Sequence, residues 1–371
     1  MRMQDQKLVA LVVTHNRLAQ LQRTVMRLLE SDPVHLRTVI VCDNASTDGT
    51  AEWLAGLADP RLEVLRLACN GGGAAGFEAG MRHAVAQHDP DWMVVMDDDG
   101  RPDPGALARF HALDLSGWDA VAAAVYTPDG AICDMNRPSR NPFWHRRVFL
   151  RSAVRLGRRD GFHLTPRDYA SDRVQPIDIT SFVGLFLSRE GMARAGYPDG
   201  RLFLYGDDGL YTLGLRQAGG RIGFVPQIVF EHDCSTFQGR AFTPLWKVYY
   251  YHRNLLILYG RAAGWMRWPL LAVVVPKWLT RIRAHPGQRR AFLRLILCAI
   301  RDGLRGRVDV DHGRILAISG EKQARINGNS GYRGDSAPRG SAPTPALSAP
   351  RPPHRRRRDS LAYSSDRRPS A

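Results

Sequence analysis

The stretch "DWMVVMDDDG" (residues 91–100) runs from an apolar segment directly into three adjacent carboxylates, Asp97, Asp98 and Asp99. Neighbouring carboxylates repel one another, and a buried carboxylate without a partner is costly. The apolar residues predict a buried strand. The acids that follow indicate that the end of this strand serves a function other than packing.

The same pattern, an apolar run followed by a polar cluster, recurs upstream in the chain. Runs that are typical of strands lie at 8–13, 37–44, 62–68 and 92–99. Segments with helical spacing of apolar residues lie between them, at 17–31, 50–58 and 76–88. This alternation predicts an α/β fold with a doubly wound, mostly parallel sheet. Ligands bind such sheets at the carboxyl ends of the strands, where "THNR", "DNASTDG", "CNGGG" and "DDD" occur.

The second half of the chain predicts further elements with a more basic character. A loop or short helix is expected at 145–161, a strand and short helix within 177–198, a helix at 205–220, a last strand at 221–233 and an aromatic-rich helix at 244–261. The apolar run 268–276 is less than half a membrane span. With Trp265, Trp268 and Trp278 around it, and the basic segment 289–307 beyond, it favours a segment that lies on a bilayer. The alternative is an ordinary helix packed on the rest of the protein.

Charge and cysteine content narrow the class of protein. The net charge is +16, and residues 261–307 hold ten Arg and one Lys against one acid, Asp302. This asymmetry predicts an anionic partner, either a membrane or a nucleic acid. The five cysteines are scattered without metal-ligand spacing, and no signal peptide is recognisable, which predicts reduced thiols in the cytoplasm.

The acidic triplet has the composition of a cation site. In an extended segment Asp97 and Asp99 would share one face and Asp98 would point the other way. Two carboxylates at a strand end suit Mg²⁺ or Mn²⁺, which could then bridge to nucleotide phosphates. The alternative is turn and capping chemistry before the next helix, and Asp103 is the predicted N-cap there.

Six motifs in order carry a family resemblance: "VVTHNR", "VCDNASTDGT", "NGGGAAGFEAG", "MDDDGRPDPGAL", "GDDGLYTLGLRQAG" and "FEHD". Together they resemble the GT-A fold glycosyltransferases of family 2, especially the branch with galactofuranosyl- and rhamnosyltransferases, over residues 8 to about 260. The resemblance implies a Rossmann-like nucleotide-binding half and an acceptor half. The expected domains are a GT-A domain at 1–240, a helical, membrane-associating segment at 241–320 and a disordered basic tail at 321–371.

The resemblance also implies residue roles. Nucleotide-sugar contacts are expected from these residues: Thr14, Asn16, Arg17, Asp43, Asn70, Gly73, Gly76, Asp97 and Asp98. Asn16 could equally cap the following helix, and the glycine-rich loop could be a plain turn. Ala75 stands where the family usually has glycine.

Asp207 and Asp208 are the candidate catalytic pair. A helix N-terminus would keep both carboxylates ionised, which suits a general base. The resemblance favours Asp208 as the base and Asp207 as the group that orients the acceptor, although both could simply cap the helix. Leu210 stands where the family usually has an acid. The resemblance also implies that His232 is a third metal ligand beside Asp97 and Asp99. Trp144, Phe182 and Trp246 are unranked candidates for the acceptor site.

The resemblance thus implies an inverting, metal-dependent transfer from a UDP-galactofuranose or dTDP-rhamnose type of donor. The acceptor would be a glycan or polyprenyl-linked lipid in cell-envelope polysaccharide synthesis, at the inner face of the cell membrane. The alternatives are a nucleotidyltransferase, which would need a basic glycine-rich loop near the first strand, and a nucleic-acid-binding protein acting through the tail with "RRRR" at 355–358. The tail lacks interleaved aromatic residues, which disfavours specific nucleic-acid binding.

Overall fold

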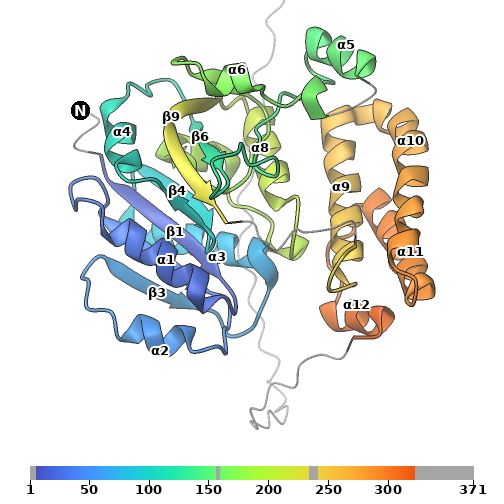
Figure 1. The fold of residues 1–371 in the computed structure, drawn as a ribbon, viewed down its shortest axis with the longest axis horizontal. Helices are drawn as coiled ribbons and strands as arrows, with labels where there is room; N and C mark the ends of the chain where they lie inside the picture. The colour runs from blue at the N-terminus through green and yellow to red at the C-terminus, as the bar shows by residue number, and fades with distance from the viewer. Residues whose placement is uncertain (1–5, 156–158, 234–240, 322–371) are drawn as a thin grey trace, which may run out of the picture. The chain divides into compact units, whose positions relative to one another are not determined.

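The computed structural model describes residues 6–155, 159–233 and 241–321 (Figure 1). The tail predicted for 321–371 lies outside these residues except for Glu321. All strands and helices of the described structure lie within these ranges.

One nine-stranded sheet organises the first part of the chain, in the order β3-β2-β1-β4-β8-β6-β9-β5, with β7 paired to β9. The strands are β1 (Leu8–Thr14), β2 (Thr38–Asp43), β3 (Leu62–Arg66), β4 (Trp92–Asp97), β5 (Gly100–Pro102), β6 (Ala120–Tyr126), β7 (Gln175–Ile177), β8 (Leu185–Ser188) and β9 (Ile222–His232). Strands β3, β2, β1 and β4 are parallel, and β6 and β9 are parallel to each other. Strands β5, β7 and β8 pair antiparallel with their neighbours. The predicted α/β fold with a mostly parallel sheet is confirmed.

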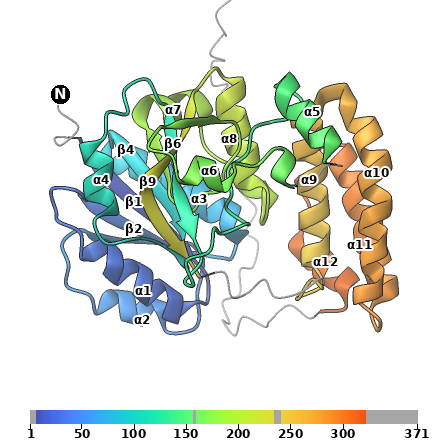
Figure 2. The same cartoon turned by 45° about the horizontal axis from the view of Figure 1, so that its top comes forward.

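Helices cover both faces of this sheet (Figures 1 and 2). The first face carries α1 (Leu18–Leu29), α2 (Thr50–Ala55) and α4 (Ala106–Ala112), and the second carries α3 (Gly72–His88), α7 (Arg189–Ala195) and α8 (Asp207–Gln217). The alternation of side chains along a strand explains the two cores. In β1, Leu8, Ala10 and Val12 belong to one core and Val9, Leu11 and Val13 to the other.

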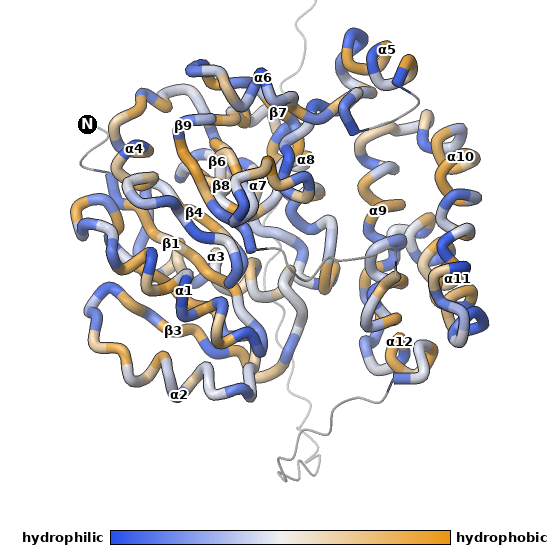
Figure 3. The backbone as a smooth tube through the Cα atoms, in the orientation of Figure 1, coloured by the Kyte–Doolittle hydropathy of each residue, from blue (hydrophilic) through white to orange (hydrophobic). Residues whose placement is uncertain are grey.

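The remaining helices follow or interrupt the sheet. They are α5 (Arg146–Val154), α6 (Pro166–Tyr169), α9 (Lys247–Ala263), α10 (Arg267–Leu279), α11 (Arg289–Leu304) and α12 (His312–Ser319), with short 3₁₀ turns at Arg159–Gly161, Gly200–Leu202, Gly264–Met266 and Thr280–Ala284. Residues of α9, α10, α11 and α12 form a third hydrophobic core around Tyr249, Phe292 and Trp278. Hydrophobic and hydrophilic residues alternate along α9, α10 and α11 (Figure 3). None of the described helices has both the length and the apolar character that crossing a bilayer requires.

Two local predictions differ from the structure. Strand β6, "AVAAAVY", is central in the sheet, but its alanines give no strand signal, because alanine favours helices. The N-cap of α4 is Gly105 with φ 78°, not Asp103, because the turn at "DPG" delays the helix by two residues.

Candidate active site

The acidic triplet lies where β4 ends beside β1. Asp97 is the last residue of β4, and Asp98 and Asp99 form a turn before β5. The Thr14 hydroxyl donates to Asp98 Oδ2 at 2.9 Å. The Arg17 guanidinium contacts Asp98 Oδ1 at 3.1 Å and Asp99 Oδ2 at 2.8 Å. The expectation that Asp98 and Asp99 point in opposite directions is therefore wrong, because these two residues form a turn and not an extended strand.

Arg17 is the cation of this cluster. Burial opposes its charge, but Asp98 and Asp99 outweigh that effect and raise the pKa of Arg17. Its side chain keeps 34% of its surface exposed. A forked guanidinium that is partly open to solvent can contact both the carboxylates and a bound anion.

His232 reaches the triplet from the end of β9, because β9 pairs with β5 directly after the triplet. Its Nε2 lies 3.1 Å from Asp99 Oδ1, and its Nδ1 lies 2.7 Å from Asn136 Oδ1. Because an amide oxygen only accepts, Nδ1 is assigned the proton that it donates to Asn136. This bond fixes the ring and directs Nε2 toward the carboxylates, as a hydrogen bond to the other ring nitrogen does for metal-bound histidines.

Burial and like charge raise the pKa of two carboxyl groups in the triplet. Burial is the main cause that raises the pKa of Asp97 to about 7, with Asp99 and Asp208 adding to it. Burial likewise raises the pKa of Asp98 to about 7 against the opposing effect of Arg17. Burial lowers the pKa of His232, but the hydrogen bond and the charge of Asp99 outweigh burial and raise this pKa to about 10. The carboxylate of Asp97 makes no hydrogen bond to any residue that the structure describes.

Asp97, Asp99 and His232 carry the donor atoms of a divalent-cation site, but in this structure their ligand atoms do not all lie within 4.8 Å of one another. Two carboxylates and one imidazole nitrogen form a donor set suited to Mn²⁺ or Mg²⁺, and a cation would relieve the repulsion between Asp97 and Asp99. Within the described ranges, the one group of three side chains whose ligand atoms all lie within 4.8 Å of one another is Glu63, His83 and His88. There Glu63 accepts hydrogen bonds from both histidines, which accounts for the cluster without an ion.

Asp207 and Asp208 open α8, whose N-cap is Gly206 with φ 74°. Asp208 Oδ1 accepts a hydrogen bond from Gly209 N at 2.6 Å. Burial raises the pKa of Asp208 to about 6, and burial together with Asp208 and Asp97 raises the pKa of Asp207 well above its ordinary value. Burial therefore opposes the expected effect of the helix N-terminus, which was to keep both groups ionised, and it does so more strongly at Asp207 than at Asp208. For Asp208 the result is a carboxylate whose pKa approaches neutrality, which favours proton transfer.

The loop before α8 is held in an unusual backbone conformation. Phe203 and Tyr205 have φ values of 66° and 68°, a region that non-glycine residues rarely adopt. The side-chain amide of Asn254, on α9, donates to the carbonyls of Leu202, Leu204 and Tyr205 at 3.0, 2.9 and 2.7 Å. Asn254 therefore maintains the turn that places the two carboxylates.

Arg253 supports the same loop from the preceding position of α9. It is fully buried, and its guanidinium donates to the Leu202 carbonyl at 2.8 Å and to Asn254 Oδ1 at 2.7 Å. The sequence analysis missed both residues. The one signal available was "HRN" inside an apolar, aromatic helix, where buried polar residues need partners.

Replacing Asn254 by Ala is expected to lower the free energy of unfolding by about 2–4 kcal/mol, because three carbonyls lose a buried donor. It should also lower kcat more than it raises KM, because the carboxylates of α8 lose their fixed position. Thermal unfolding and steady-state kinetics check the two effects. Gln217→Ala, which removes an exposed amide at the end of α8, is the control and should change stability by less than about 0.5 kcal/mol. Equal stabilities of the two variants would contradict this role.

The edge next to β2 offers an unsatisfied acceptor. Asp43 is fully buried at the end of β2, and its Oδ1 accepts from Ser46 N at 2.9 Å. Its Oδ2 is buried without a hydrogen-bond partner, although Arg66 Nε lies 3.5 Å away. A buried carboxylate oxygen at a strand end that has an ion-pair contact but no hydrogen bond is suited to accept a bond from a ligand.

Other predicted nucleotide contacts have defined local roles. Asn16 does not cap α1, because its Oδ1 accepts from Thr47 N at 2.7 Å and thus links two loops. Asn70 Oδ1 accepts from Gly72 N at 2.8 Å. A Cβ on Gly73 would meet open space, whereas one on Gly76 would lie 2.5 Å from Val13 Cγ1. Close packing of α3 on β1 therefore accounts for Gly76, and space for a ligand remains at Gly73.

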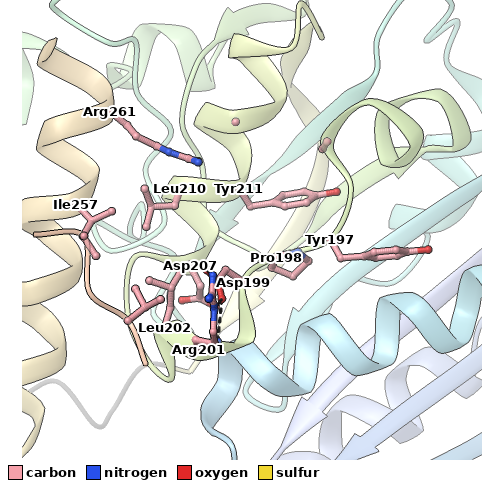
Figure 4. A pocket seen from close by; sticks show the side chains of 14 residues that line it. Tyr197, Pro198, Asp199, Arg201, Leu202, Asp207, Leu210, Tyr211, Ile257 and Arg261 are labelled. Atoms are coloured by element: carbon pink, nitrogen blue, oxygen red, sulfur yellow. Dashed lines mark hydrogen bonds and ion pairs between the residues drawn. The ribbon is translucent and has the colours of Figure 1, made fainter. Parts of the chain in front are cut away.

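A cavity of about 320 Å³ is lined in part by Asp207, at the start of α8 (Figure 4). Leu210, Tyr211 and Ile257 give it apolar walls, and Arg201 and Arg261 contribute charge. Leu210 is the position where the family pattern has an acid, so this departure makes the wall of the cavity apolar. Of the three unranked aromatic residues, Phe182 is buried against Phe77 in the core.

The chain is similar to known glycosyltransferases. The model of the family "Glycosyl transferase family 2" matches residues 9–171. Galactofuranosyltransferase GlfT1 of Mycolicibacterium smegmatis is 31% identical over 232 residues, which span 61% of this chain and 71% of that protein. Undecaprenyl-phosphate mannosyltransferase of Micrococcus luteus is 27% identical over 178 residues, which span 47% of this chain and 70% of that protein.

A solved structure is also similar to part of this chain. It is the mannosyltransferase PcManGT from Pyrobaculum calidifontis in complex with GDP-Man and Mn²⁺. The sequence identity is 18%, the TM-score is 0.47, and the match covers 85% of this chain and 79% of that one.

Proposed function

The chain belongs to glycosyltransferase family 2, and from this premise we propose that it performs an inverting, metal-dependent transfer from a nucleotide diphosphate sugar. The observation that carries the proposal is the pairing of β9 with β5, directly after the acidic triplet that ends β4. It brings His232 within 3.1 Å of Asp99, in a buried cluster where Asp97 experiences the charges of both Asp99 and Asp208. Cation ligands and a base of suitable pKa are thus neighbours.

Each residue of the cluster has a proposed task. Asp97, Asp99 and His232 would hold Mg²⁺ or Mn²⁺, which would offset the charge that develops on the leaving diphosphate. Asp208 takes the proton from the acceptor hydroxyl as that oxygen attacks the anomeric carbon. Asp207 faces the cavity and orients the acceptor. Arg17 and Asp43 contact the diphosphate and the nucleoside.

The donor is proposed to be a UDP-galactofuranose or dTDP-rhamnose type of sugar nucleotide. The relative named galactofuranosyltransferase supports the first donor. The acceptor is proposed to be a glycan or a polyprenyl-linked lipid of the cell envelope, and the name of the undecaprenyl-phosphate mannosyltransferase supports the polyprenyl-linked lipid. The unpartnered Asp43 Oδ2 supports a nucleoside that offers an N–H or O–H donor.

A thermal-shift screen tests nucleotide and metal together. UDP or dTDP with Mn²⁺ is expected to raise the unfolding midpoint by several degrees at about 100 times Kd, and either component alone should raise it less. Asp43→Asn, which turns the unpartnered oxygen into a donor, should lose most of the nucleotide shift. A midpoint that no nucleotide changes in the presence of Mn²⁺ would count against the proposal.

The C-terminal helices are proposed to place the enzyme on anionic lipids at the inner face of the cell membrane. Trp265, in the turn between α9 and α10, is 77% exposed, and Trp268 and Val273, in α10, are 55% and 70% exposed. The arginines around them complement anionic headgroups, and tryptophan prefers the membrane interface. The lipid-linked acceptor would then reach the active site from the bilayer surface.

A further inference from the structure

Helix α5 presents an apolar ridge that no described residue covers. Leu150 and Val154 are 63% and 83% exposed and lie one turn apart on the same face. Val148 and Ser152, on the opposite face, are buried against the protein. One side of the helix therefore packs against the protein, and the other side exposes the apolar side chains of Leu150 and Val154.

The charge around this ridge has a single sign. Residues 141–159 contain six arginines and no acidic residue. Arg146 and Arg147 are exposed and flank the Leu150–Val154 ridge in the helical projection. An exposed apolar ridge bordered by arginines is the pattern of a helix that lies in the interface of an anionic bilayer.

The base of α5 is firmly attached to the catalytic part of the molecule. Asp178 is buried, and its Oδ2 accepts from Asn141 N at 2.8 Å and contacts His145 Nε2 at 2.7 Å. Its Oδ1 accepts from Arg216 Nε, on the helix that begins with the catalytic pair, at 2.9 Å. The orientation of α5 is thus coupled to that of α8.

The same segment lies beside the turn between α9 and α10. The Asn141 side chain donates to the carbonyl of Ala262, near the end of α9, at 3.0 Å. Figures 1 and 2 both show α5 next to this turn. Trp265 and Trp268 follow within six residues of Ala262. The apolar ridge of α5 and the exposed tryptophans are therefore neighbours.

We propose that α5 is a second lipid-contacting element, whose Leu150 and Val154 enter an anionic bilayer while Arg146 and Arg147 contact its phosphates. The inference rests on the membrane docking proposed above. Two contacts, one at α5 and one at the α9–α10 turn, define an orientation where one contact would leave the enzyme free to rotate. Because hydrogen bonds of Asp178 join the start of α5 to α8, α8 would be held in a defined orientation relative to the bilayer as well.

The test is binding of the full chain to sedimenting vesicles, made either of phosphatidylcholine with phosphatidylglycerol or of phosphatidylcholine alone. Leu150→Gln with Val154→Gln should weaken binding to the anionic vesicles about 10-fold or more. The matched control, Val34→Gln with Val64→Gln, removes exposed apolar side chains elsewhere and should bind like the original protein. Unchanged thermal midpoints would show that both double variants are folded.

The outcomes separate the two proposals. Suppose that the original protein binds anionic vesicles and that Trp265→Gln with Trp268→Gln weakens this binding. If the α5 double variant then binds as well as the original protein, α5 has no lipid role and the docking proposal stands. If the original protein binds neither vesicle, both proposals fail. If the ridge instead joins two copies of the chain, light scattering would show a dimer that the α5 variant dissociates, which would also overturn the inference.

Discussion

Asp208→Asn is expected to lower kcat by about 10²–10⁴-fold while leaving binding of the nucleotide with Mn²⁺ nearly unchanged. The amide keeps the size of the side chain and can still accept from Gly209 N, as Asp208 Oδ1 does at 2.6 Å. It cannot take a proton from the acceptor hydroxyl. Steady-state kinetics with calorimetric nucleotide titration separates the two effects, and Asp129→Asn, at an exposed turn, is the control.

The pH profile gives a second readout of the same residue. Burial raises the pKa of Asp208 to about 6, and only the ionised form acts as a base. The value of kcat/KM should therefore be at its plateau above this pKa and fall as the pH decreases through about 6. Activity that stays constant down to pH values near 4, the range of an ordinary aspartate, would exclude Asp208 as the base. So would an Asp208→Asn variant with unchanged turnover.

The strand ends could be predicted from sequence because each continuous apolar run stops at a cluster of polar residues. Buried parallel strands are continuous apolar runs, so the first polar residues after each run mark the carboxyl edge of the sheet. The polar clusters that contain Thr14, Asp43 and Asp97 were placed at this edge in that way, whereas the roles of Thr14 and Asp43 came from the family resemblance. Each of the three is the last residue of its strand. What the periodicity does not contain is the turn at Asp98 and Asp99, which directs both toward Arg17.

The contacts that hold the proposed catalytic pair in place could not be predicted from the nearby sequence. Asn254 follows Leu202 by about fifty residues and meets its loop through the packing of α9, which no short motif encodes. The pKa of Asp208 depends on burial, which is a property of the folded chain. Strand β6 was missed for a related reason. Its alanines favour helices by themselves, but pairing with β8 and β9 on either side places them in the sheet.

Asp99→Asn is expected to reduce kcat/KM at fixed Mn²⁺ by about 10²–10³-fold, because the cation loses one of its two charged ligands. The loss should be partly reversed at higher Mn²⁺ concentration, since Asp97 and His232 remain. Asp99 also accepts from Arg17 and contacts His232, so the substitution disturbs charge as well as ligation. Asp98→Asn is the matched control, because Asp98 contacts the same Arg17 but is not a predicted metal ligand.

The decisive quantity is the Mn²⁺ concentration that gives half-maximal rate. It should rise strongly for Asp99→Asn and stay nearly constant for Asp98→Asn, even if both variants lose turnover through Arg17. Without a cation, the pKa of His232 is raised to about 10, largely by Asp99 against the opposing effect of burial, so metal binding must displace a proton from Nε2. The original protein should therefore need less Mn²⁺ as the pH rises, and Asp99→Asn should show a weaker pH dependence because its His232 is less basic. Identical Mn²⁺ requirements in both variants would mean that the acidic triplet serves Arg17 and not a cation, and the metal-dependent mechanism would have to be given up.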